Sequence, residues 1–259
     1  MPTLLTDRST AHSDQTHHCG ILGLHNNDIC TLQAGFPQAQ APIALIGAGN
    51  KLEEGFLIPQ DGHCRVFPSQ GGQAEFAPQD GWAYQILLHL RSRENTSYIS
   101  MDHVISDRGI VSIYRCLRDD YSAAPESPAL TAAFKHWAET SQDRLRTERL
   151  ADAIAQHAIE GQDILSRKTM ELFVQFYGAE AGNLALKLFP DGGLYIMGTI
   201  ASKIKPLMER EGFLEAFLNK GRLRSRLEQI PVHIVMNSEA TLASTTQRLT
   251  TAAEAQLVS

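Results

Sequence analysis

The chain has 259 residues, of which 43% are hydrophobic and 20% are charged, and its net charge is −6. This composition is typical of a soluble globular protein with a sizeable core, and the lack of a basic tract disfavours nucleic acid or an anionic membrane as a partner. No apolar run reaches the length of a membrane span, and no secretory apolar core is present. The four cysteines are widely spaced and form no Cys-x-x-Cys pair. We therefore expect reduced thiols and a cytoplasmic location.

Residues 1–19 are polar and irregular. They include a group of possible metal ligands, namely His12, His17, His18 and Cys19. No spacing within this group fixes a ligand geometry, so an irregular lead-in is favoured over a metal cluster. From Gly20 onward the sequence becomes regularly patterned. We expect an irregular segment over 1–19 and one domain over 20–259.

Three short apolar runs follow one another in the first third of the chain. They are Ile43–Ile46, Phe56–Ile58 and Cys64–Phe67, and the dipeptide Asp61-Gly62 marks a turn between the last two. Short apolar runs separated by turn residues are typical of an antiparallel meander. The polar, glycine-bearing stretch Pro68–Gln73 that follows predicts a loop.

Helical spacing of apolar residues dominates the rest of the chain. The predicted helices cover 82–90, 102–117, 134–159, 164–189, 200–210, 213–220 and 223–227, and the predicted strands cover 194–197 and 232–236. Small residues in the helix over 164–189 would let it lie close to its neighbours: Gly178, Ala179, Ala181, Gly182 and Ala185. A meander followed by strands that alternate with helices predicts an α/β protein with a mixed sheet covered by helices.

The turn Asp191-Gly192-Gly193 leads into the compact apolar run Leu194–Met197, and Gly198 stands where this strand gives way to the next helix. In open α/β sheets, ligands bind at the carboxyl ends of strands, where backbone N–H groups are free. Any α/β protein has such a strand–turn–helix unit, so the pattern alone favours an ordinary connection, and a binding crevice beside Gly198 is the alternative.

Several motifs, in the same order along the chain, carry a resemblance to one family. They are GILGL at Gly20–Leu24, TLQAG at Thr31–Gly35, APIALIGAG at Ala41–Gly49, PSQGGQAEFAP at Pro68–Pro78, YGAEAGNLALKL at Tyr177–Leu188 and GGLYIMG at Gly192–Gly198. On these motifs the stretch from 20 to 237 resembles bacterial glucokinases, most closely those of cyanobacterial type. The resemblance implies an actin-like (ribonuclease-H-like) sugar kinase fold. It also leads us to expect the large domain of that fold, with most of the small N-terminal domain missing.

Members of this family transfer the γ-phosphoryl group of ATP to the 6-hydroxyl of glucose with the help of Mg²⁺, a step of glycolysis. Phosphoryl transfer depends on positioning and charge neutralisation, so glycine-rich turns must let backbone N–H groups reach the phosphates. The resemblance therefore implies ATP and Mg²⁺ as cofactors and glucose as the substrate.

The nucleotide-binding positions that the resemblance implies are partly altered. They are Gly47, Gly49, Asn50, Gly192, Gly193, Gly198 and Thr199. Where the family pattern is Gly-Ala-Gly-Thr-Gly-Leu-Gly, Lys51 and Glu53 replace two glycines. A carboxylate about 4 Å from a phosphate charge costs up to roughly 4 kcal/mol at an effective dielectric of about 20. We expect weakened ATP binding, partly offset by Lys51.

The sugar-binding positions are altered as well. Gln70 and Gln73 stand where the family has Glu and His, and Asp102 aligns with a second sugar-binding Glu. Taken singly, these residues are typical of polar loops and helix caps, and the resemblance is what identifies them as substrate-binding positions. Glutamine still hydrogen-bonds a hydroxyl group, so we expect weak glucose binding with reduced discrimination.

The catalytic base has no match in the chain. In the family an Ile-Asn-Asp-Phe motif precedes the GILGL segment, whereas here Asp14 is one place out of register and Asp28 lies downstream in an unrelated stretch. The family's first phosphate loop, Asp-x-Gly-Gly-Thr, also has no counterpart. We therefore assign no catalytic residue and no metal ligand.

Three interpretations remain open. The first is a glucokinase-family protein with impaired or lost kinase activity. The second is a pseudokinase that binds sugar or a partner protein, either as a homo-oligomer or with a full-length relative. The third is an active kinase that uses another base, such as Asp14 or Asp28.

Overall fold

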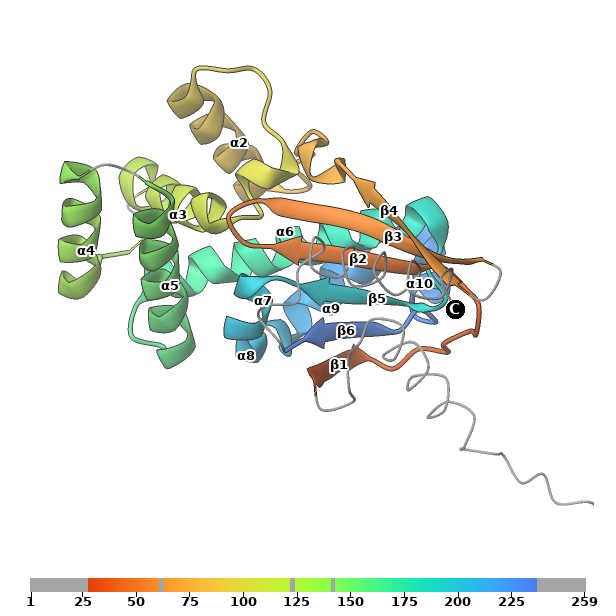
Figure 1. The fold of residues 1–259 in the computed structure, drawn as a ribbon. Coiled ribbons are helices and arrows are strands. Elements are labelled where there is room, and N and C mark those ends of the chain that lie inside the picture. The colour runs from red at the N-terminus through yellow and green to blue at the C-terminus, as the bar shows by residue number, and fades with distance from the viewer. Residues whose placement is uncertain (1–27, 61–62, 122–123, 141–142, 237–259) are drawn as a thin grey trace, which may run out of the picture.

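The computed structural model describes residues 28–60, 63–121, 124–140 and 143–236 (Figure 1). Six strands in this part form one sheet in the order β1-β6-β5-β2-β3-β4. They are β1 (Ile29–Gln33), β2 (Ile43–Ala48), β3 (Leu52–Gln60), β4 (His63–Ser69), β5 (Gly193–Met197) and β6 (Val232–Val235). β5 runs parallel to β2 and β6, and every other pairing is antiparallel. The expected mixed α/β sheet is present, whereas the lead-in over 1–19 and Asp14 lie outside the described residues.

The antiparallel meander expected from the three apolar runs is confirmed. β3 pairs with β2, where Ile43 is opposite Leu57, and with β4, where Phe56 is opposite Phe67. The edge strand β1 has no counterpart among the predicted strands. Its residues are half-buried or exposed, so no apolar periodicity marks it in the sequence.

Helices cover one face of the sheet and extend beyond one of its ends. They are α2 (Gly81–Glu94), α3 (Asp107–Arg115), α4 (Pro128–Glu139), α5 (Arg144–Glu160), α6 (Ile164–Leu188), α7 (Thr199–Lys203), α8 (Lys205–Met208), α9 (Glu211–Leu218) and α10 (Arg224–Leu227). Shorter elements are the 3₁₀ turns η2 (Gly71–Gln73), η3 (Met101–His103) and η5 (Gly221–Leu223) and the π-helix η4 (Cys116–Asp120). In Figure 1, α6 passes behind the sheet, while α3, α4 and α5 gather beyond one end. Among the described helices, none is both long and apolar enough to cross a bilayer.

The core is built around α6. Successive residues of a strand point to opposite faces, so the residues of β2 and β5 divide between two apolar clusters. The larger cluster joins α6 to one face of the sheet through residues such as Ala44, Ile46, Leu194 and Ile196. The smaller cluster, on the other face, contains Ile43, Leu45, Tyr195 and Met197. α6 therefore packs against this face of the sheet together with neighbouring helices.

The small residues of α6 allow α9 to pack closely, as the sequence predicts. A Cβ atom added to Gly178 would lie 2.2 Å from the carbonyl oxygen of Phe213, and one added to Gly182 would lie 2.5 Å from that of Phe217. Real Cβ atoms do not approach backbone oxygens this closely. The contact between the two helices therefore requires glycine at both positions.

The segment over 134–159, predicted to be mostly helical, is helical in two separate pieces. α4 ends at Glu139, and α5 begins at Arg144 after a break in the chain's helical conformation. The side chain of Asp143 accepts a hydrogen bond from the backbone N–H of Arg146 at 3.0 Å, which satisfies one of the free donors of the first turn of α5. This cap lies within a continuous helical pattern, which hides it from an analysis of periodicity.

The predicted helices over 102–117 and 200–210 are also divided. The first begins as an α-helix only at Asp107, because Ser106 is its N-cap and accepts a hydrogen bond from the N–H of Gly109 at 3.2 Å. The second separates into α7 and α8, with Pro206 in the first turn of α8, where a proline has no hydrogen bond to lose.

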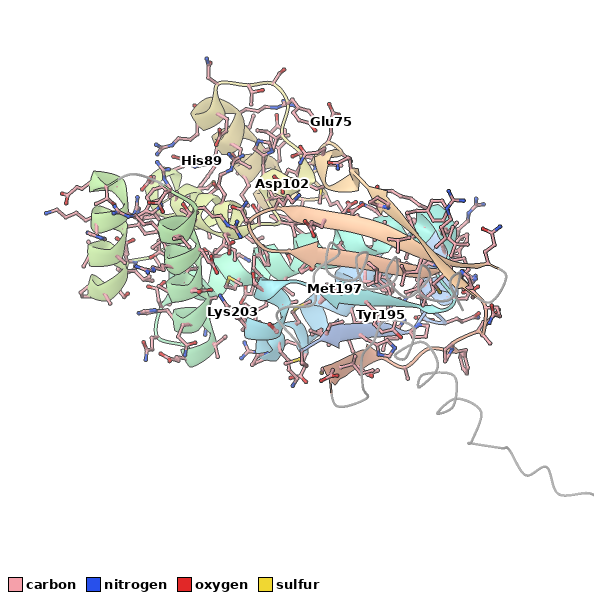
Figure 2. All side chains as sticks on the ribbon, viewed as in Figure 1. Glu75, His89, Asp102, Tyr195, Met197 and Lys203 are labelled. Carbon is pink, nitrogen blue, oxygen red and sulfur yellow. The ribbon has the colours of Figure 1, made fainter. Side chains whose placement is uncertain are left out.

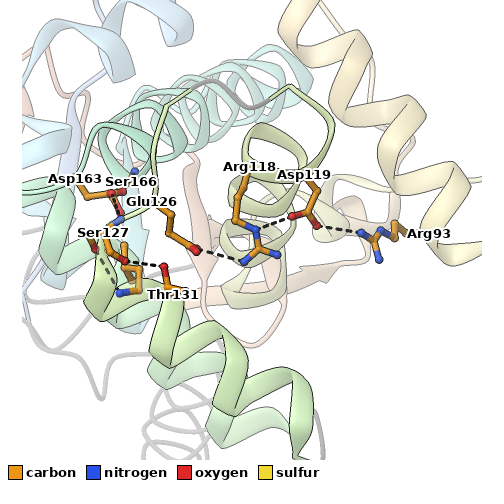
Figure 3. A network of polar contacts seen from close by, with 9 residues as sticks. Arg93, Arg118, Asp119, Glu126, Ser127, Thr131, Asp163 and Ser166 are labelled. Atoms are coloured by element: carbon orange, nitrogen blue, oxygen red, sulfur yellow. Dashed lines mark hydrogen bonds and ion pairs between the residues drawn. The ribbon is translucent and has the colours of Figure 1, made fainter.

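Charged side chains connect α2 to the helical layer beyond the sheet (Figure 3). Arg93 of α2 donates to one oxygen of Asp119 at 3.1 Å, and Arg118 donates to the other at 2.6 Å. Arg118 also reaches Glu126, just before α4, at 3.3 Å. In the same view Asp163 accepts from the N–H groups of Ser127 and Ser166, so one carboxylate caps α6 and holds the residue that starts α4.

We expect Gly178→Ala to lower the free energy of unfolding by about 1–3 kcal/mol, because α6 and α9 must separate to admit the methyl group. Gly212→Ala is the matched control, because its Cβ would lie 3.9 Å from the nearest atom, a methyl carbon of Val174. Alanine favours a helix over glycine by up to about 1 kcal/mol, so this variant should not lose stability. Urea unfolding measures both variants. Equal stability of the two would contradict the close α6–α9 contact.

Candidate functional site

The carboxyl ends of β2 and β5 lie side by side and border a cavity of about 240 Å³. The strands are paired from Ile43 opposite Gly193 to Gly47 opposite Met197, so both end at the same edge of the sheet. The cavity is lined at the strand ends and the loops that follow by Gly47, Ala48, Gly49, Asn50, Lys51, Glu53, Gly198 and Thr199, and from α5 by Arg144. It occupies the place where the sequence predicts a crevice beside Gly198.

Close backbone approach shapes this cavity. Gly198 has φ +92°, and a Cβ there would lie 2.5 Å from the carbonyl oxygen of Ala48. Both the positive φ and the close approach to Ala48 require glycine at position 198. Across the cavity, a Cβ on Gly49 would lie 3.3 Å from Thr199 Oγ1, so these two loops nearly touch. The structure thus brings together the predicted positions Gly47, Gly49, Asn50, Gly198 and Thr199.

Gly192 and Gly193 lie elsewhere. They stand at the amino end of β5, the opposite end from the cavity, and do not line it. Gly193 has φ +119°, and a Cβ on Gly192 would lie 2.7 Å from the carbonyl oxygen of Ala41. Both glycines are accounted for by the tight turn into β5, and the structure gives them no contact with the nucleotide-binding positions.

Three charged side chains line the cavity. Lys51 Nζ lies 3.3 Å from Glu53 Oε1, so the two residues that replace family glycines form an ion pair. Glu53 is the one carboxylate among the described lining residues, and Arg144 adds a second cation from α5. Nothing in the sequence around Arg144 points to this role, because α5 reaches the cavity only through the tertiary fold.

The loop with Gln70 and Gln73 forms η2, directly after β4. Gly71 N–H donates to Ser69 Oγ at 3.0 Å, and Gln73 N–H donates to the carbonyl oxygen of Gln70 at 2.9 Å. The Tyr98 hydroxyl donates to the carbonyl oxygen of Gln73. The loop is therefore held by its backbone, and both glutamine side chains are left exposed.

Asp102 joins this loop to the cavity. Its Oδ1 accepts a hydrogen bond from the N–H of Leu52 at 2.5 Å, directly after the glycine-bearing turn between β2 and β3. The neighbouring Met101 N–H donates to the carbonyl oxygen of Ala74 at 2.9 Å, which ties η3 to the end of the Gln70–Gln73 loop. In Figure 2 Asp102 lies beside the helical elements and Met197 lies within the sheet. The predicted substrate positions and the cavity are thus neighbours, although part of the Asp102 carboxylate is already engaged.

Asp107, which the sequence does not single out, anchors the same region. Its backbone N–H donates to the carbonyl oxygen of Gly49 at 2.9 Å, and its carboxyl group is buried at the start of α3. Burial, reinforced by Glu148 and Asp152, raises the pKa of Asp107 to about 6. The carboxyl group does not line the cavity. Asp107 therefore supports the turn that contains Gly49 without lining the cavity.

Asp28 does not line the cavity. It precedes β1, the edge strand, and its carbonyl oxygen accepts a hydrogen bond from Met236 N–H at 2.7 Å. β6 lies between β1 and β5, which borders the cavity, and adjacent strands are about 4.8 Å apart, so β1 is about 10 Å from β5. This placement gives no support to Asp28 as a base.

One group among the described residues has metal-ligand types in reach of one another: His89, Cys116 and Asp120, whose ligand atoms lie within 4.8 Å. His89 Nδ1 and Asp120 Oδ2 already form a hydrogen bond at 2.6 Å. Burial, followed by the charges of Asp120 and Asp119, raises the pKa of Cys116 to about 12, so its thiol keeps its proton at neutral pH. Since the thiolate is the ligand form, the hydrogen bond accounts for this group better than a metal does.

Comparisons with known proteins identify the family and the fold. A family model described as Glucokinase matches residues 15–251. The glucokinase of Trichormus variabilis is 47% identical over 223 residues, which are 86% of this chain and 65% of that protein. The chain thus spans slightly less than two thirds of the length of this relative.

Solved structures share the fold. A glucokinase from an Antarctic psychrotroph superposes with a TM-score of 0.69 at 21% identity, covering 93% of this chain and 67% of that one. A glucokinase from Balamuthia mandrillaris, solved in complex with glucose, superposes with a TM-score of 0.70 at 16% identity, covering 92% and 63%. The mixed sheet flanked by helices is therefore the α/β fold of the actin-like sugar kinases. Together with the family match, this shows that the chain belongs to the glucokinase family.

Proposed function

We propose that this chain binds glucose and ATP at the cavity between β2 and β5 and the adjoining Gln70–Gln73 loop, and that its transfer of phosphate to glucose is weak. One observation carries the proposal: Asp102 binds the Leu52 N–H at 2.5 Å, so the predicted sugar position and the glycine-bearing turn form one continuous surface. Membership of the glucokinase family and the glucose-bound Balamuthia structure of the same fold support the assignment of substrate.

The cavity suits the phosphates of ATP. Gly49 and Gly198 leave the backbone of both loops open at the strand ends, and Lys51 and Arg144 supply positive charge. Phosphoryl transfer relies on such positioning and neutralisation, and ATP with Mg²⁺ would supply the transferred group and further neutralise its charge. The residues of this chain would hold and orient the phosphates.

The same residues explain why transfer is weak. Glu53 places negative charge in the cavity, and its ion pair with Lys51 takes up one of the two cations. Among the described lining residues no other carboxylate is present to accept a proton from a glucose hydroxyl. A positioned general base contributes about 10²–10⁴ in rate, so we infer a correspondingly slow reaction.

Glu53→Gln should tighten ATP binding about tenfold. The substitution removes the negative charge and frees Lys51 to contact a phosphate, and a charge-assisted hydrogen bond is worth about 1.5–3 kcal/mol. Calorimetric titration with ATP measures the change. Glu139→Gln, an exposed ion-pair partner of Lys135 on α4, is the control and should leave the affinity unchanged. An unaltered affinity in Glu53→Gln would show that the phosphates do not bind here.

Restoring the family residues with the double substitution Gln70→Glu and Gln73→His should tighten glucose binding by about tenfold to a hundredfold, because hydrogen bonds to charged groups are stronger than those of neutral amides. Both side chains are exposed, so the fold should tolerate the change. Titration with glucose, and with sorbitol as a non-cyclic control, gives the measurement. A variant that binds glucose no better than the parent would place the sugar elsewhere.

Kinase activity itself is tested by coupling glucose 6-phosphate formation to NADP⁺ reduction. We expect slow turnover that needs both ATP and Mg²⁺. Turnover at the rate of an ordinary glucokinase would contradict the proposed weakness. Absence of binding by both glucose and ATP would contradict the proposed function as a whole.

The alternative is a pseudokinase that binds sugar or a partner protein without transferring phosphate. The presence of Glu53 as the one described carboxylate of the cavity favours it. Under this alternative glucose raises the melting temperature with the logarithm of its concentration while no glucose 6-phosphate forms. Light scattering, alone and with a full-length family member, tests the homo-oligomer or mixed assembly that such a role would use.

A further inference from the structure

Glu54 carries a buried carboxyl group whose oxygens accept no hydrogen bond of normal length from the described residues. The residue is 0% exposed, and both of its side-chain oxygens lack a donor. It follows the cavity residue Glu53 on β3 and pairs in register with Ser69, the last residue of β4 before the Gln70–Gln73 loop. Buried carboxyl groups are normally hydrogen-bonded, so this one requires a physical explanation.

A second buried acid faces Glu54 from α6. Glu180 is 3% exposed, and Lys187 Nζ lies 3.8 Å from an oxygen of each of the two carboxyl groups. Asn183 donates a hydrogen bond to Glu180 at 2.9 Å. Two buried acids therefore share one ammonium group that is partly exposed and too distant for a hydrogen bond, so neutralisation of the pair is incomplete.

Burial, followed by the charge of Glu180, raises the pKa of Glu54 to about 7, and Lys187 opposes this shift. The other titratable groups around Glu54 and Glu180 are engaged with other partners. Burial raises the pKa of Tyr177, whose hydroxyl accepts a hydrogen bond from the N–H of Ala48. Burial lowers the pKa of Lys220, which donates a hydrogen bond to Asn183. Glu54 thus keeps its proton to a higher pH than a solvated glutamate does.

The Gln70–Gln73 loop packs directly against the Glu54 carboxyl group. A Cβ on Gly71 would be 1.8 Å from Glu54 Oε2, and one on Gly72 would be 2.5 Å from the carbonyl oxygen of Leu52. The loop backbone is therefore packed on β3 with no room for a side chain between them. Any charge or movement of the Glu54 carboxyl group acts first on this loop.

We propose that Glu54 is a positioning residue for the hexose-binding loop: as a neutral acid paired with Glu180 it supports Gly71 and Gly72, and its ionisation displaces them. The role of the loop in hexose binding rests on the proposed function, whereas the coupling between Glu54 and the loop does not. Ionisation would create a buried carboxylate without a donor, and the nearest movable donors are Lys187 and the N–H groups of the loop.

The sign of the pH effect follows from the direction of the shift. The folded chain holds a proton on Glu54 that the unfolded chain loses at an ordinary glutamate pKa, so the stabilisation is complete below about 4.5 and is lost as the pH rises through about 7. Hexose binding to the neutral form should weaken over the upper part of the same range. The affinity falls about tenfold for each unit by which the hexose raises the pKa of Glu54.

The coupling is tested without any ligand. In ¹³C,¹⁵N-labelled protein titrated from about pH 5 to about pH 9, the Glu54 side-chain carbonyl and the Gly71 and Gly72 amides should share one midpoint near 7. Glu180→Gln removes the neighbouring charge and should move all three midpoints downward together. Glu171→Gln, an exposed position on the same helix, is the control and should move none. A Glu54 midpoint near 4, or loop amides that do not follow it, would overturn the proposal.

Glucose titration then separates the two proposals. The parent chain should bind glucose more weakly at pH 8.5 than at pH 6, and Glu54→Gln, which mimics the neutral acid, should bind equally at both. Equal affinity of the parent at the two pH values would overturn the positioning role. No glucose binding at either pH, with loop amides that still follow Glu54, would refute the hexose site and leave the coupling intact.

Discussion

The parallel pairing of β2 with β5 is the constraint on which the site depends. It brings two chain segments some 150 residues apart to end at one edge of the sheet, so that Gly49 and Thr199 nearly touch. Gly198 completes the arrangement, because its positive φ turns the chain away from Ala48 without a side chain in the gap. The cavity therefore arises from the pairing of the strands and the backbone conformation at Gly198, and not from the side chains that line it.

α6 holds this pairing in place and connects it with the Gln70–Gln73 loop. Tyr177 accepts a hydrogen bond from the N–H of Ala48 at 3.0 Å, at the end of β2. One turn further on, Glu180 faces Glu54, on which Gly71 lies. A single helix therefore supports both the cavity between β2 and β5 and the Gln70–Gln73 loop, and close packing of α9 against Gly178 and Gly182 holds the helix in position.

The sequence predicts what depends on local patterning and fails where tertiary contacts decide. The meander, the strand after Gly192-Gly193 and the close-packed face of α6 follow from apolar runs and small residues, and the structure confirms them. The break before Arg144 and the reach of that residue into the cavity depend on a cap and on the fold. Gly192 and Gly193, which the resemblance places among the nucleotide-binding positions, form the turn into β5 and do not line the cavity.

The glycines and the polar residues of the site are under different physical constraints. A side chain at Gly72 or Gly198 would collide with backbone oxygens at 2.5 Å, so these positions must remain glycine for the sheet and loops to fold, whether or not phosphate is transferred. Lys51, Glu53 and Gln70 reach into the cavity or solvent, where the fold tolerates other side chains. The presence of these glycines alone therefore says little about kinase activity. The identities of the polar side chains carry that information, and it is on Glu53, Gln70 and Gln73 that the proposal of binding with slow transfer rests.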